Sequence, residues 1–425
     1  MPIYWHWLKY WLKKGKKMSD AIVVSGMGCI SAAGKNVAEF SSSIFQPSLS
    51  SCISTTNILK PDENISFLAA QVKDYAANDY FTKKELKLLD RYAQFALISA
   101  EQAIKDANLV FDASNQQRSS VVHGTSIGGQ ETIEHAYAEL FEQGKSRTHP
   151  FTVPKLLPSS ATAHIAMKYG IKGPTFATSS ACSSSGHAIA MAVLMLRSHL
   201  IDYAIVGGAE ACLSKGNFYA WNGLRVLSND ACRPFSKNRS GLVMGEGAAS
   251  LILERESTAK NRGATLYAKL VGIGMSSDAY NIVQPLAEGA ESAMAAAISD
   301  AGLNAADIGY INAHGSGTIQ NDKTESEAIL SVFKDSGIAP LVSSTKGTHG
   351  HMLGAGAALE SIAAILALRK QTAPATCNFD EKDPLCNINL VVNSKVNANL
   401  SHVMSNSFAF GGLNTSLIFQ LADRQ

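Results

Sequence analysis

From residue 21 onward, short runs of β-branched and apolar residues alternate with longer segments rich in small apolar residues. The short runs predict buried strands, and the longer segments have the length and spacing typical of helices. The expected strands cover residues 21–27, 119–124, 203–208, 249–254, 309–315 and 415–420, and helices are expected at 89–108, 185–198, 292–301 and 357–369. Strands that alternate with helices indicate an α/β fold.

Part of this pattern occurs twice. The sequence AIKDANL at residues 103–109 returns as AISDAGL at residues 297–303, and each copy precedes an expected strand that ends in His-Gly, at His123 and at His314. Two similar units half a chain apart suggest two copies of one α/β domain, with chance similarity between alanine-rich helices as the alternative. A duplicated fold would bring strand ends from both halves together, so the site residues would be far apart in sequence.

The composition is that of a globular protein with a large core. The chain has 425 residues, of which 46% are hydrophobic and 17% are charged, and this balance excludes a disordered or fibrous protein. The formal net charge is +2, but residues 1–17 hold five lysines and no acid, which leaves 32 basic against 35 acidic residues in the remainder. The main part of the chain therefore gives no reason to expect a nucleic acid partner.

The cysteines and the apolar runs point to a reducing, aqueous setting. The seven cysteines fit no disulfide framework and include no C-x-x-C zinc pair. The longest uninterrupted apolar run, at residues 188–196, is nine residues long, whereas a membrane-spanning helix needs about 20. We therefore expect a cytoplasmic protein with no transmembrane segment.

Residues 1–17, MPIYWHWLKYWLKKGKK, form a separate basic and aromatic extension with three of the four Trp residues. Its lysines follow the aromatic stretch and no small-residue cleavage site is visible, so it does not resemble a secretory signal. One interpretation is contact with a membrane surface. The favoured interpretation is an extension without a role, such as one produced by a start site upstream of Met18.

Cys182 is the first candidate for chemistry. It lies in SSACSSSG, between a short strand-like run and an apolar helix. Unpaired N–H groups and the positive end of the dipole at a helix N-terminus favour a thiolate, which predicts a nucleophile. The alternative is an inert buried cysteine.

Three other segments carry candidate groups. His314 follows a strand and precedes a Gly-Ser-Gly-Thr turn, but it could be a structural histidine. The segment at 342–360, VSSTKGTHGHMLGAGAALE, is rich in glycines that allow close approach of a ligand, and it contains Lys346, His349, His351 and Glu360, any of which could instead be an ordinary loop or surface residue. In SNSFAFGGLN at 405–414, the two glycines after Phe410 could form a gate or simply a turn.

Taken together, these segments resemble the β-ketoacyl-acyl-carrier-protein synthases, the elongating condensing enzymes of type II fatty acid and polyketide systems. The resemblance covers about residues 21–421 and rests on SSACSSSG at 179–186, VGGAE at 206–210, NAHGSGT at 312–318, SSTKGTHGHMLGA at 343–355 and NSFAFGG at 406–412. It implies a thiolase-like fold of duplicated α/β domains in α-β-α-β-α layers. The implied N-terminal half spans residues 18–265 and the C-terminal half spans residues 266–425.

The resemblance also implies a reaction. An acyl group would be transferred to Cys182 and then condensed with malonyl-acyl-carrier protein, with loss of CO₂, to give a 3-oxoacyl-carrier protein. His314 and His351 would lie at the thioester carbonyl of the extender. Lys346 would support the active-site network, and Glu360 would organise that network. The backbone N–H groups of Cys182 and Phe410 would form the oxyanion hole, and Phe410, Gly411 and Gly412 would form the gate. His349 is expected to be non-catalytic, and the reaction needs no metal or redox cofactor.

The resemblance also implies residues that bind the pantetheine arm and the acyl chain. Ser316 and Thr318 keep hydroxyls that would meet the pantetheine arm, although Gly317 replaces a serine of the family pattern. The acyl pocket would be lined by Ile127, Phe218 and Trp221, and the bulky side chains of Phe218, Tyr219 and Trp221 would suit a short, unsaturated or aryl-bearing chain. Aryl polyene or polyketide assembly is therefore a hypothesis beside ordinary fatty acid elongation.

The implied partner is an acyl carrier protein with a phosphopantetheine arm. Because that protein is acidic, basic residues near the pocket mouth would steer it, and Lys84, Lys87 and Arg225 occupy the matching positions. Lys84 and Lys87 could equally be ordinary surface charges. The family is dimeric, so we expect a homodimer or a heterodimer with a chain-length-factor homologue.

Three related classes of protein are less compatible with the sequence. A thiolase needs a second cysteine near the carboxyl end, and none follows Cys386. An initiating condensing enzyme would have Asn at the position of His351. A chain-length factor is a non-catalytic homologue that lacks the nucleophile, whereas Cys182 is present.

Overall fold

The structure is a computed structural model that describes residues 20–46, 52–56 and 66–422. The interpretation of residues 1–17 lies outside these residues. In the part of the chain that the structure describes, no helix is long and apolar enough to cross a membrane.

A ten-stranded sheet runs through the molecule in the order β11-β10-β14-β15-β9-β1-β8-β6-β4-β5. Its first-half strands are β1 (Ile22–Ser31), β4 (Ser119–Gly124), β5 (Thr175–Thr178), β6 (Tyr203–Glu210) and β8 (Gly247–Arg255). Its second-half strands are β9 (Ala268–Ser277), β10 (Ile308–Asn312), β11 (Leu341–Ser343), β14 (His402–Ala409) and β15 (Leu413–Leu421). The halves meet where β1 pairs antiparallel with β9.

The two halves have the same topology. Outward from the centre, the order β1-β8-β6-β4-β5 corresponds to β9-β15-β14-β10-β11. In both halves the first two pairings are antiparallel and the last two are parallel. The duplication predicted from the repeated AIKDANL sequence is therefore confirmed, and β4 and β10, the strands that end near His123 and His314, are equivalent.

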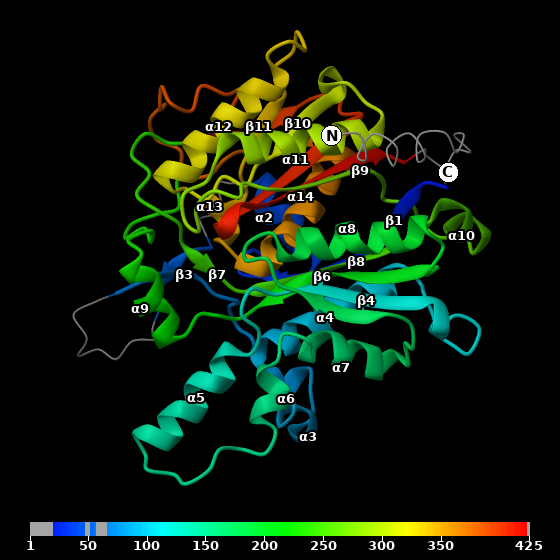
Figure 1. Ribbon diagram of the computed structural model, residues 1–425, viewed down its shortest axis with the longest axis vertical. Helices are drawn as coiled ribbons and strands as arrows, with labels where there is room; N and C mark the ends of the chain where they lie inside the picture. The colour runs from blue at the N-terminus through cyan, green and yellow to red at the C-terminus, as the bar shows by residue number, and fades with distance from the viewer. Residues whose placement is uncertain (1–19, 47–51, 57–65, 423–425) are drawn as a thin grey trace, which may run out of the picture.

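Helices cover both faces of each half-sheet (Figure 1). The outer layers are formed by α4 (Arg91–Asp106) and α7 (Ser160–Tyr169) on one side and by α11 (Ala287–Ala301) and α12 (Ile319–Phe333) on the other. Between the half-sheets lie α8 (Ser184–Arg197) and α14 (Gly356–Lys370), which contact each other and strands of both halves. α14 is buried on every side from Gly356 to Leu368, as expected for a helix that is apolar all round. These are the α-β-α-β-α layers of the expected thiolase-like fold.

Glycines set the distance between the central strands and the outer helices. A Cβ atom added at Gly28 of β1 would lie 2.2 Å from the Ser99 carbonyl oxygen of α4. A Cβ atom at Gly274 of β9 would lie 1.9 Å from the Ala293 carbonyl oxygen of α11. Both separations are too short for any side chain, so the same close packing of helix on strand recurs in the two halves.

Shorter elements complete the chain. The remaining helices are α2 (Val37–Phe45), α3 (Lys83–Leu86), α5 (Gln130–Phe141), α6 (Thr152–Leu156), α9 (Lys215–Gly223), α10 (Glu256–Asn261) and α13 (Lys346–His349), with 3₁₀ turns η1 (Ala77–Asp79), η2 (Gln116–Arg118), η3 (Ala305–Asp307), η4 (Leu353–Ala355) and η5 (Phe410–Gly412). The minor strands are β2 (Ser54–Thr55), β3 (Leu68–Ala70), β7 (Met244–Gly245), β12 (Thr372–Ala373) and β13 (Val396–Asn397). In Figure 1, α5 and α6 project below the layered body.

Every strand and helix expected from the sequence is present; β4 has the expected bounds, and the other elements have one or both ends shifted. Residues 405–409, which belong to the string interpreted as a gate or a turn, lie in β14, a strand that was not expected and that pairs with β10 and β15. Its residues Ser405, Asn406 and Ser407 are polar but buried, so this strand lacks the apolar run that indicated the others. The boundary expected at residue 265 lies in the connection between β8 and β9.

Candidate active site

Cys182 lies in a tight turn between β5 and α8. The residue before it, Ala181, has a φ of 48°, a left-handed conformation that is strained for a residue with a side chain. Hydrogen bonds hold this turn, because the Ala181 carbonyl accepts from Ser126 Oγ at 2.9 Å and from Ser184 Oγ at 2.6 Å. The turn leaves Cys182 7% exposed at the base of a cavity.

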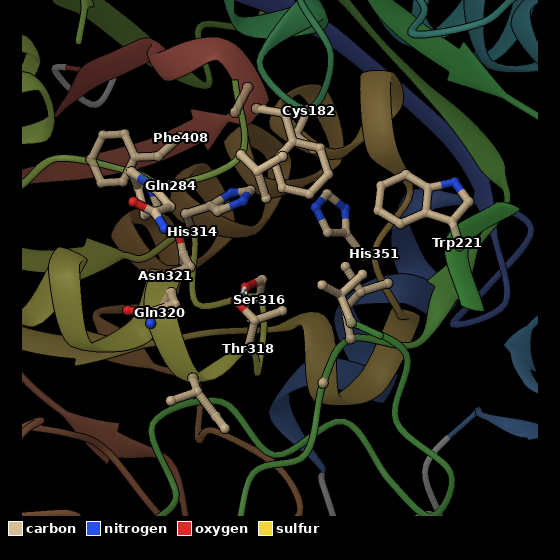
Figure 2. Close-up of a pocket in the computed structure, with 18 of the residues that line it drawn as sticks. Cys182, Trp221, Gln284, His314, Ser316, Thr318, Gln320, Asn321, His351 and Phe408 are labelled. Carbon is tan, nitrogen blue, oxygen red and sulfur yellow. Dashed lines mark hydrogen bonds between the residues drawn. The ribbon is translucent and has the colours of Figure 1, made fainter. Parts of the chain in front are cut away.

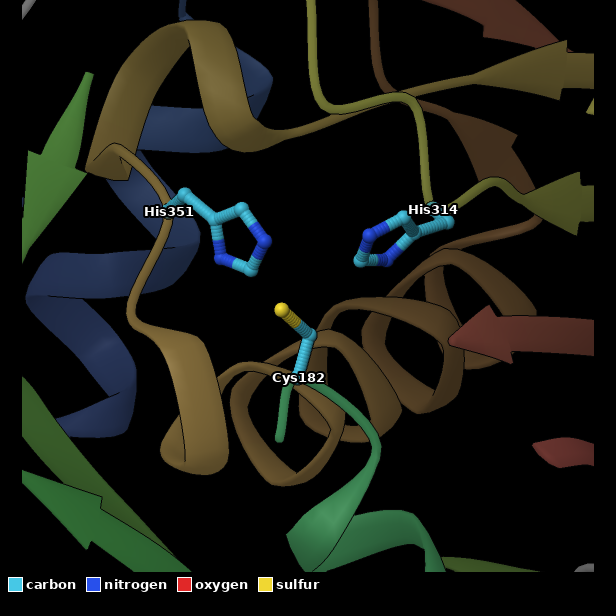
Figure 3. Close-up of side chains that lie close together, drawn as sticks. All are labelled: Cys182, His314 and His351. Carbon is cyan, nitrogen blue, oxygen red and sulfur yellow. The ribbon is translucent and has the colours of Figure 1, made fainter. Parts of the chain in front are cut away.

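Two histidines lie beside the sulfur. His314 follows the carboxyl end of β10, and His351 lies between α13 and η4. Their ring centroids are 5.2 Å apart, and the ligand atoms of Cys182, His314 and His351 all lie within 4.8 Å of one another. Figure 3 shows both rings on the same side of the cysteine, facing its sulfur. Three residues distant in sequence therefore meet in one place.

The hydrogen bonds of the histidines determine where their protons lie. The Leu353 N–H donates to His351 Nδ1 at 3.1 Å, and Lys346 Nζ lies 3.4 Å from His314 Nδ1. In both rings Nδ1 therefore accepts, which leaves the single proton of a neutral imidazole on Nε2. Burial, reinforced by the charge of Lys346, holds the pKa of both histidines well below the usual value, so both rings are neutral.

The spacing of Cys182, His314 and His351 would also allow a metal ion. A metal-bound histidine usually donates its second N–H to an acceptor such as a carbonyl or carboxylate oxygen. Here the second nitrogen, Nδ1, receives a hydrogen bond instead. The two rings are therefore arranged as N–H donors, and this fits stabilisation of a negative oxygen better than ligation of a metal.

A buried charged network lies behind His314. Lys346 Nζ forms an ion pair with Glu360 and donates to the His314 carbonyl oxygen at 2.5 Å. Glu325 of α12 accepts hydrogen bonds from the backbone N–H groups of His314 at 2.8 Å and Gly315 at 2.7 Å. Burial raises the pKa of Glu360 and of Glu325 to about 7. The sequence analysis missed Glu325, whose only signal is its place on the buried face of the helix that follows NAHGSGT.

The cavity above the sulfur has a volume of about 320 Å³ and is lined mainly by apolar atoms. Figure 2 shows the two histidines and the hydroxyls of Ser316 and Thr318 facing it. From the predicted residues it brings together Cys182, Trp221, Arg225, His314, Ser316, Thr318, His351 and Phe410. The sequence analysis missed other lining residues, namely Gln284 in the connection between β9 and α11, Gln320 and Asn321 in the first turn of α12, and Phe408 of β14, which lies inside the quoted NSFAFGG motif.

Phe410 closes one side of this cavity. Its ring stacks on Trp221 of α9 with the centroids 5.7 Å apart, and its backbone N–H donates to the sulfur of Cys182. Gly411 and Gly412 follow with φ angles of 79° and 67°, which residues with side chains rarely adopt. These glycines do not line the cavity but form the turn that presents the Phe410 N–H.

Other predicted residues lie elsewhere. Phe218 is fully buried and stacks on Phe67 with the centroids 4.9 Å apart, in an apolar cluster that Trp221 also contacts. Ile127 packs in the apolar cluster that contains Cys182, without lining the cavity. Lys84 and Lys87 are exposed at α3 and do not line the cavity.

The ionisation of Cys182 differs from the thiolate that its place at a helix N-terminus predicts. Burial raises its pKa to about 12, although the charge of Lys346 and the Phe410 N–H act in the opposite direction. Desolvation of a sulfur anion outweighs both effects, so the resting group is a thiol.

Comparison with known proteins identifies the family. Residues 19–259 match the β-ketoacyl synthase N-terminal domain, and residues 267–380 match the β-ketoacyl synthase C-terminal domain. The chain belongs to the β-ketoacyl synthase family. It is a condensing enzyme of the acyltransferase class, as expected from the sequence.

Characterised relatives match nearly the whole chain. Nodulation protein E from Rhizobium leguminosarum bv. trifolii is 40% identical over 404 residues, which are 95% of this chain and 100% of the relative. The 3-oxoacyl-[acyl-carrier-protein] synthase 2 of Staphylococcus aureus (strain COL) is 37% identical over 408 residues, which are 94% of this chain and 98% of the relative.

Solved structures share the fold. The ishigamide ketosynthase/chain length factor has a TM-score of 0.90 at 30% identity, with 95% of this chain and 100% of that chain covered. A ketosynthase (ApeO) in complex with its chain length factor (ApeC) from Xenorhabdus doucetiae has a TM-score of 0.81 at 31% identity, with 96% of this chain and 100% of that chain covered.

Proposed function

We propose that this chain condenses an acyl group held on Cys182 with malonyl-acyl-carrier protein and releases CO₂ and a 3-oxoacyl-carrier protein. The observation that carries this proposal is the meeting of the Cys182 sulfur with two neutral imidazoles within 4.8 Å. A thiol accepts an acyl group, and two N–H donors stabilise an enolate oxygen. Condensation of two thioesters needs both functions in one cavity.

In the first half-reaction, the Cys182 sulfur attacks the acyl thioester of the carrier. The negative oxygen of the tetrahedral intermediate binds to the backbone N–H groups of Cys182 and Phe410. The carrier sulfur then leaves and receives the proton that the Cys182 thiol loses. Because burial raises the pKa of this thiol, the proton leaves it only as the sulfur attacks.

In the second half-reaction, the malonyl thioester loses CO₂ and becomes an enolate. The Nε2–H groups of His314 and His351 donate to the enolate oxygen, and each such donor contributes on the order of 3 kcal/mol to the transition state. The enolate carbon attacks the acyl-Cys182 carbonyl, the carbon–sulfur bond breaks, and the released sulfur takes up one proton. Lys346 and Glu360 act behind His314, where they hold its backbone and its tautomer.

The carrier arm reaches the sulfur through the cavity. Ser316 and Thr318 have hydroxyls 2.9 Å apart in its wall, and these are the proposed contacts of the pantetheine amides. Arg225 lines the cavity, while Lys84 and Lys87 would contact the acidic carrier farther out. Reversal of all three charges should raise KM for the carrier at low salt; an unchanged KM would remove this assignment.

The proposed assembly is a dimer, either of two copies of this chain or of this chain with a chain-length-factor homologue. β5 is the outer strand of the sheet and has an unpaired edge among the described residues, and an open edge is suited to pairing with another chain. β5 ends four residues before Cys182, so a partner there would border the nucleophile.

The proposed class of acyl chain follows from the aromatic side chains of the cavity. Trp221 and Phe410 line it together with Cys182 and stack on each other. Phe67 and Phe218 form a second stacked pair outside the cavity, in the apolar cluster against which Trp221 packs. A planar, conjugated or aryl-bearing chain can replace the ring contacts that it displaces. We therefore propose short, unsaturated or aryl-bearing acyl groups, as in polyketide or aryl polyene assembly, ahead of long saturated fatty acyl chains.

The alternatives of a thiolase or a non-catalytic chain-length factor find less support. Among the described cysteines, Cys182 alone lines the cavity, so the second cysteine that a thiolase needs is absent there. A chain-length factor is non-catalytic, whereas this site combines a nucleophile with two histidine N–H donors.

The deciding experiment is intact-mass analysis of the purified chain after incubation with a panel of acyl-carrier thioesters. We expect an acyl adduct that is lost in Cys182→Ala, and 3-oxoacyl-carrier product after malonyl-carrier is added. An adduct that persists in Cys182→Ala, or an acyl enzyme that never reacts with malonyl-carrier, would contradict the proposal.

A further inference from the structure

Glu210, the last residue of β6, has a fully buried carboxylate whose partners all belong to active-site loops. Oε1 accepts from Thr125 Oγ1 at 3.0 Å and from the Ile127 N–H at 3.4 Å. Oε2 accepts from the Ser126 N–H at 2.7 Å and from the Gly354 N–H at 3.0 Å. The carboxylate thus binds one loop from each half of the molecule.

The four donors use the full hydrogen-bonding capacity of an ionised carboxylate, two on each oxygen. Three of the donors are backbone N–H groups, which cannot accept a hydrogen, so they favour the ionised form. Burial raises the pKa of Glu210, and these neutral donors act in the opposite direction. The charge of the carboxylate is balanced by oriented backbone dipoles and not by a buried cation.

The first of the two loops leads to the nucleophile. Ser126, whose N–H binds Glu210, donates through Oγ to the carbonyl of Ala181 at 2.9 Å. Ala181 is the strained residue immediately before Cys182. Glu210 therefore supports, through one intermediate residue, the turn that aims the sulfur.

The second loop leads to one of the histidines. Gly354, whose N–H binds Glu210, follows Leu353, which has a φ of 43° and donates its N–H to His351 Nδ1. A Cβ atom at Gly354 would lie 2.4 Å from the Ser126 nitrogen, so the two loops touch directly. The contact that fixes the tautomer of His351 is therefore adjacent to the contact that supports Cys182.

We propose that Glu210 is a positioning residue that fixes the Cys182 sulfur and the His351 Nε2–H relative to each other by binding both of their loops through one anion. This inference rests on the proposed condensation. Acylation of Cys182 and decarboxylation of the malonyl group use these two residues separately, so an anchor common to both loops must affect both steps. The charge of Glu210 also acts on the sulfur directly, since it raises the pKa of Cys182.

Three variants test this inference. Glu210→Gln removes the charge and replaces one acceptor oxygen by an NH₂ group that faces N–H donors. Glu210→Asp keeps the charge but shortens the reach. The control is Glu254→Gln, because Glu254 is also fully buried in the same sheet but pairs with Tyr203 at the opposite end of β6 and binds Arg262.

Three rates are measured on the folded full-length chain: Cys182 acylation by acyl-carrier, CO₂ release from malonyl-carrier, and Cys182 alkylation by iodoacetamide at neutral pH. In Glu210→Gln we expect acylation and CO₂ release to slow about 10- to 100-fold. Its alkylation should be faster than that of the wild type, because loss of a negative charge near the sulfur lowers the pKa of Cys182. Glu210→Asp should slow acylation and CO₂ release but leave the alkylation rate near that of the wild type.

Glu254→Gln should leave all three quantities within about twofold of the wild type, even where it lowers the melting temperature. The inference is overturned if Glu210→Gln also leaves the three quantities near those of the wild type. It is overturned as well if Glu254→Gln changes them as much as Glu210→Gln does, since equal effects would indicate a general loss of packing. If the wild type accepts no acyl group from any carrier, the proposed function fails, while the alkylation rates still decide whether Glu210 acts on Cys182.

Discussion

At the scale of single residues, burial controls the chemistry of this site. The same desolvation keeps the Cys182 thiol protonated, keeps His314 and His351 neutral, and raises the pKa of the supporting acids Glu325 and Glu360. A neutral imidazole with its proton on Nε2 donates that N–H to an enolate oxygen while the proton stays on the ring. The site therefore works through fixed dipoles and donors more than through a strong base.

The raised pKa of Glu325 predicts a pH dependence of stability. Its pKa rises from 4.5 to about 7 in the folded chain. Between these values the folded state holds a proton that the unfolded state lacks, so the stability of the wild type relative to Glu325→Gln should increase as the pH falls from about 7 towards 4.5. Chemical denaturation across this range should show a difference of about one proton between the two proteins.

The control for this measurement is Glu327→Gln, an exposed position on the same helix, α12. Its stability should follow that of the wild type at every pH. Parallel stability curves for the wild type and Glu325→Gln would show that the folded state does not bind the expected proton.

Trp221 should control which acyl chains Cys182 accepts. Trp221→Leu removes the ring that stacks on Phe410 and opens space beside the sulfur. We expect the acylation rate with long saturated chains to rise about 10-fold relative to conjugated chains, measured by intact mass with a series of carrier thioesters. Tyr219→Leu, at a 40% exposed position of the same helix, should keep the wild-type preference. An unchanged preference in Trp221→Leu would contradict the proposed acyl class.

At the scale of elements, α9 is held in place by α5. Glu134 of α5 accepts from Ser214 Oγ at 2.5 Å and from the Gly216 N–H at 3.1 Å, so its carboxylate lies at the N-terminus of the helix that carries Trp221. An anion at this position satisfies unpaired N–H groups and complements the helix dipole.

We expect Glu134→Ala to lower the free energy of unfolding by about 1 kcal/mol and to increase amide hydrogen exchange within α9. Both follow from the loss of a capping group. Glu139→Ala, on the same helix in an ion pair with Lys145, should leave exchange in α9 unchanged. Equal exchange in the two variants would show that α9 is held by packing alone.

Some elements could be predicted from the sequence and others could not. Apolar strands such as β6 and all-apolar helices such as α14 were predicted, because continuous apolar residues have few alternatives to burial. The polar strand β14 was not, since Ser405, Asn406 and Ser407 are buried and one of the two strands that pair with β14 is β10, far away in the sequence. The local sequence pattern gives no information about such a partner.

At the scale of the whole molecule, exposed apolar side chains of Phe151, Leu157 and Met167 line one hollow between α6 and α7. Met167 is 67% exposed, which is unusual for a large apolar side chain. Because α7 contacts β5, whose outer edge is open among the described residues, we expect this patch to be covered in the proposed dimer. Sedimentation analysis should therefore find a dimer for the wild type and a monomer for the double variant Leu157→Lys, Met167→Lys.

The matched control is Val110→Lys, a substitution of an apolar residue that is 72% exposed outside the patch. This variant should remain dimeric. A wild type that sediments as a monomer at all concentrations, or a double variant that stays dimeric, would exclude the patch as the interface.

The sequence by itself determined the alternation of strands and helices, the duplication, and the residue types of the reaction, because these are properties of local pattern and of short motifs such as NAHGSGT. It did not determine the thiol state of Cys182, the tautomers of the two histidines, or the roles of Glu325 and Glu210. Those depend on water being excluded and on hydrogen bonds between loops more than a hundred residues apart, such as Glu210 to Gly354. Desolvation and long-range contacts exist only once the two halves have packed together, so the tertiary structure alone decided them.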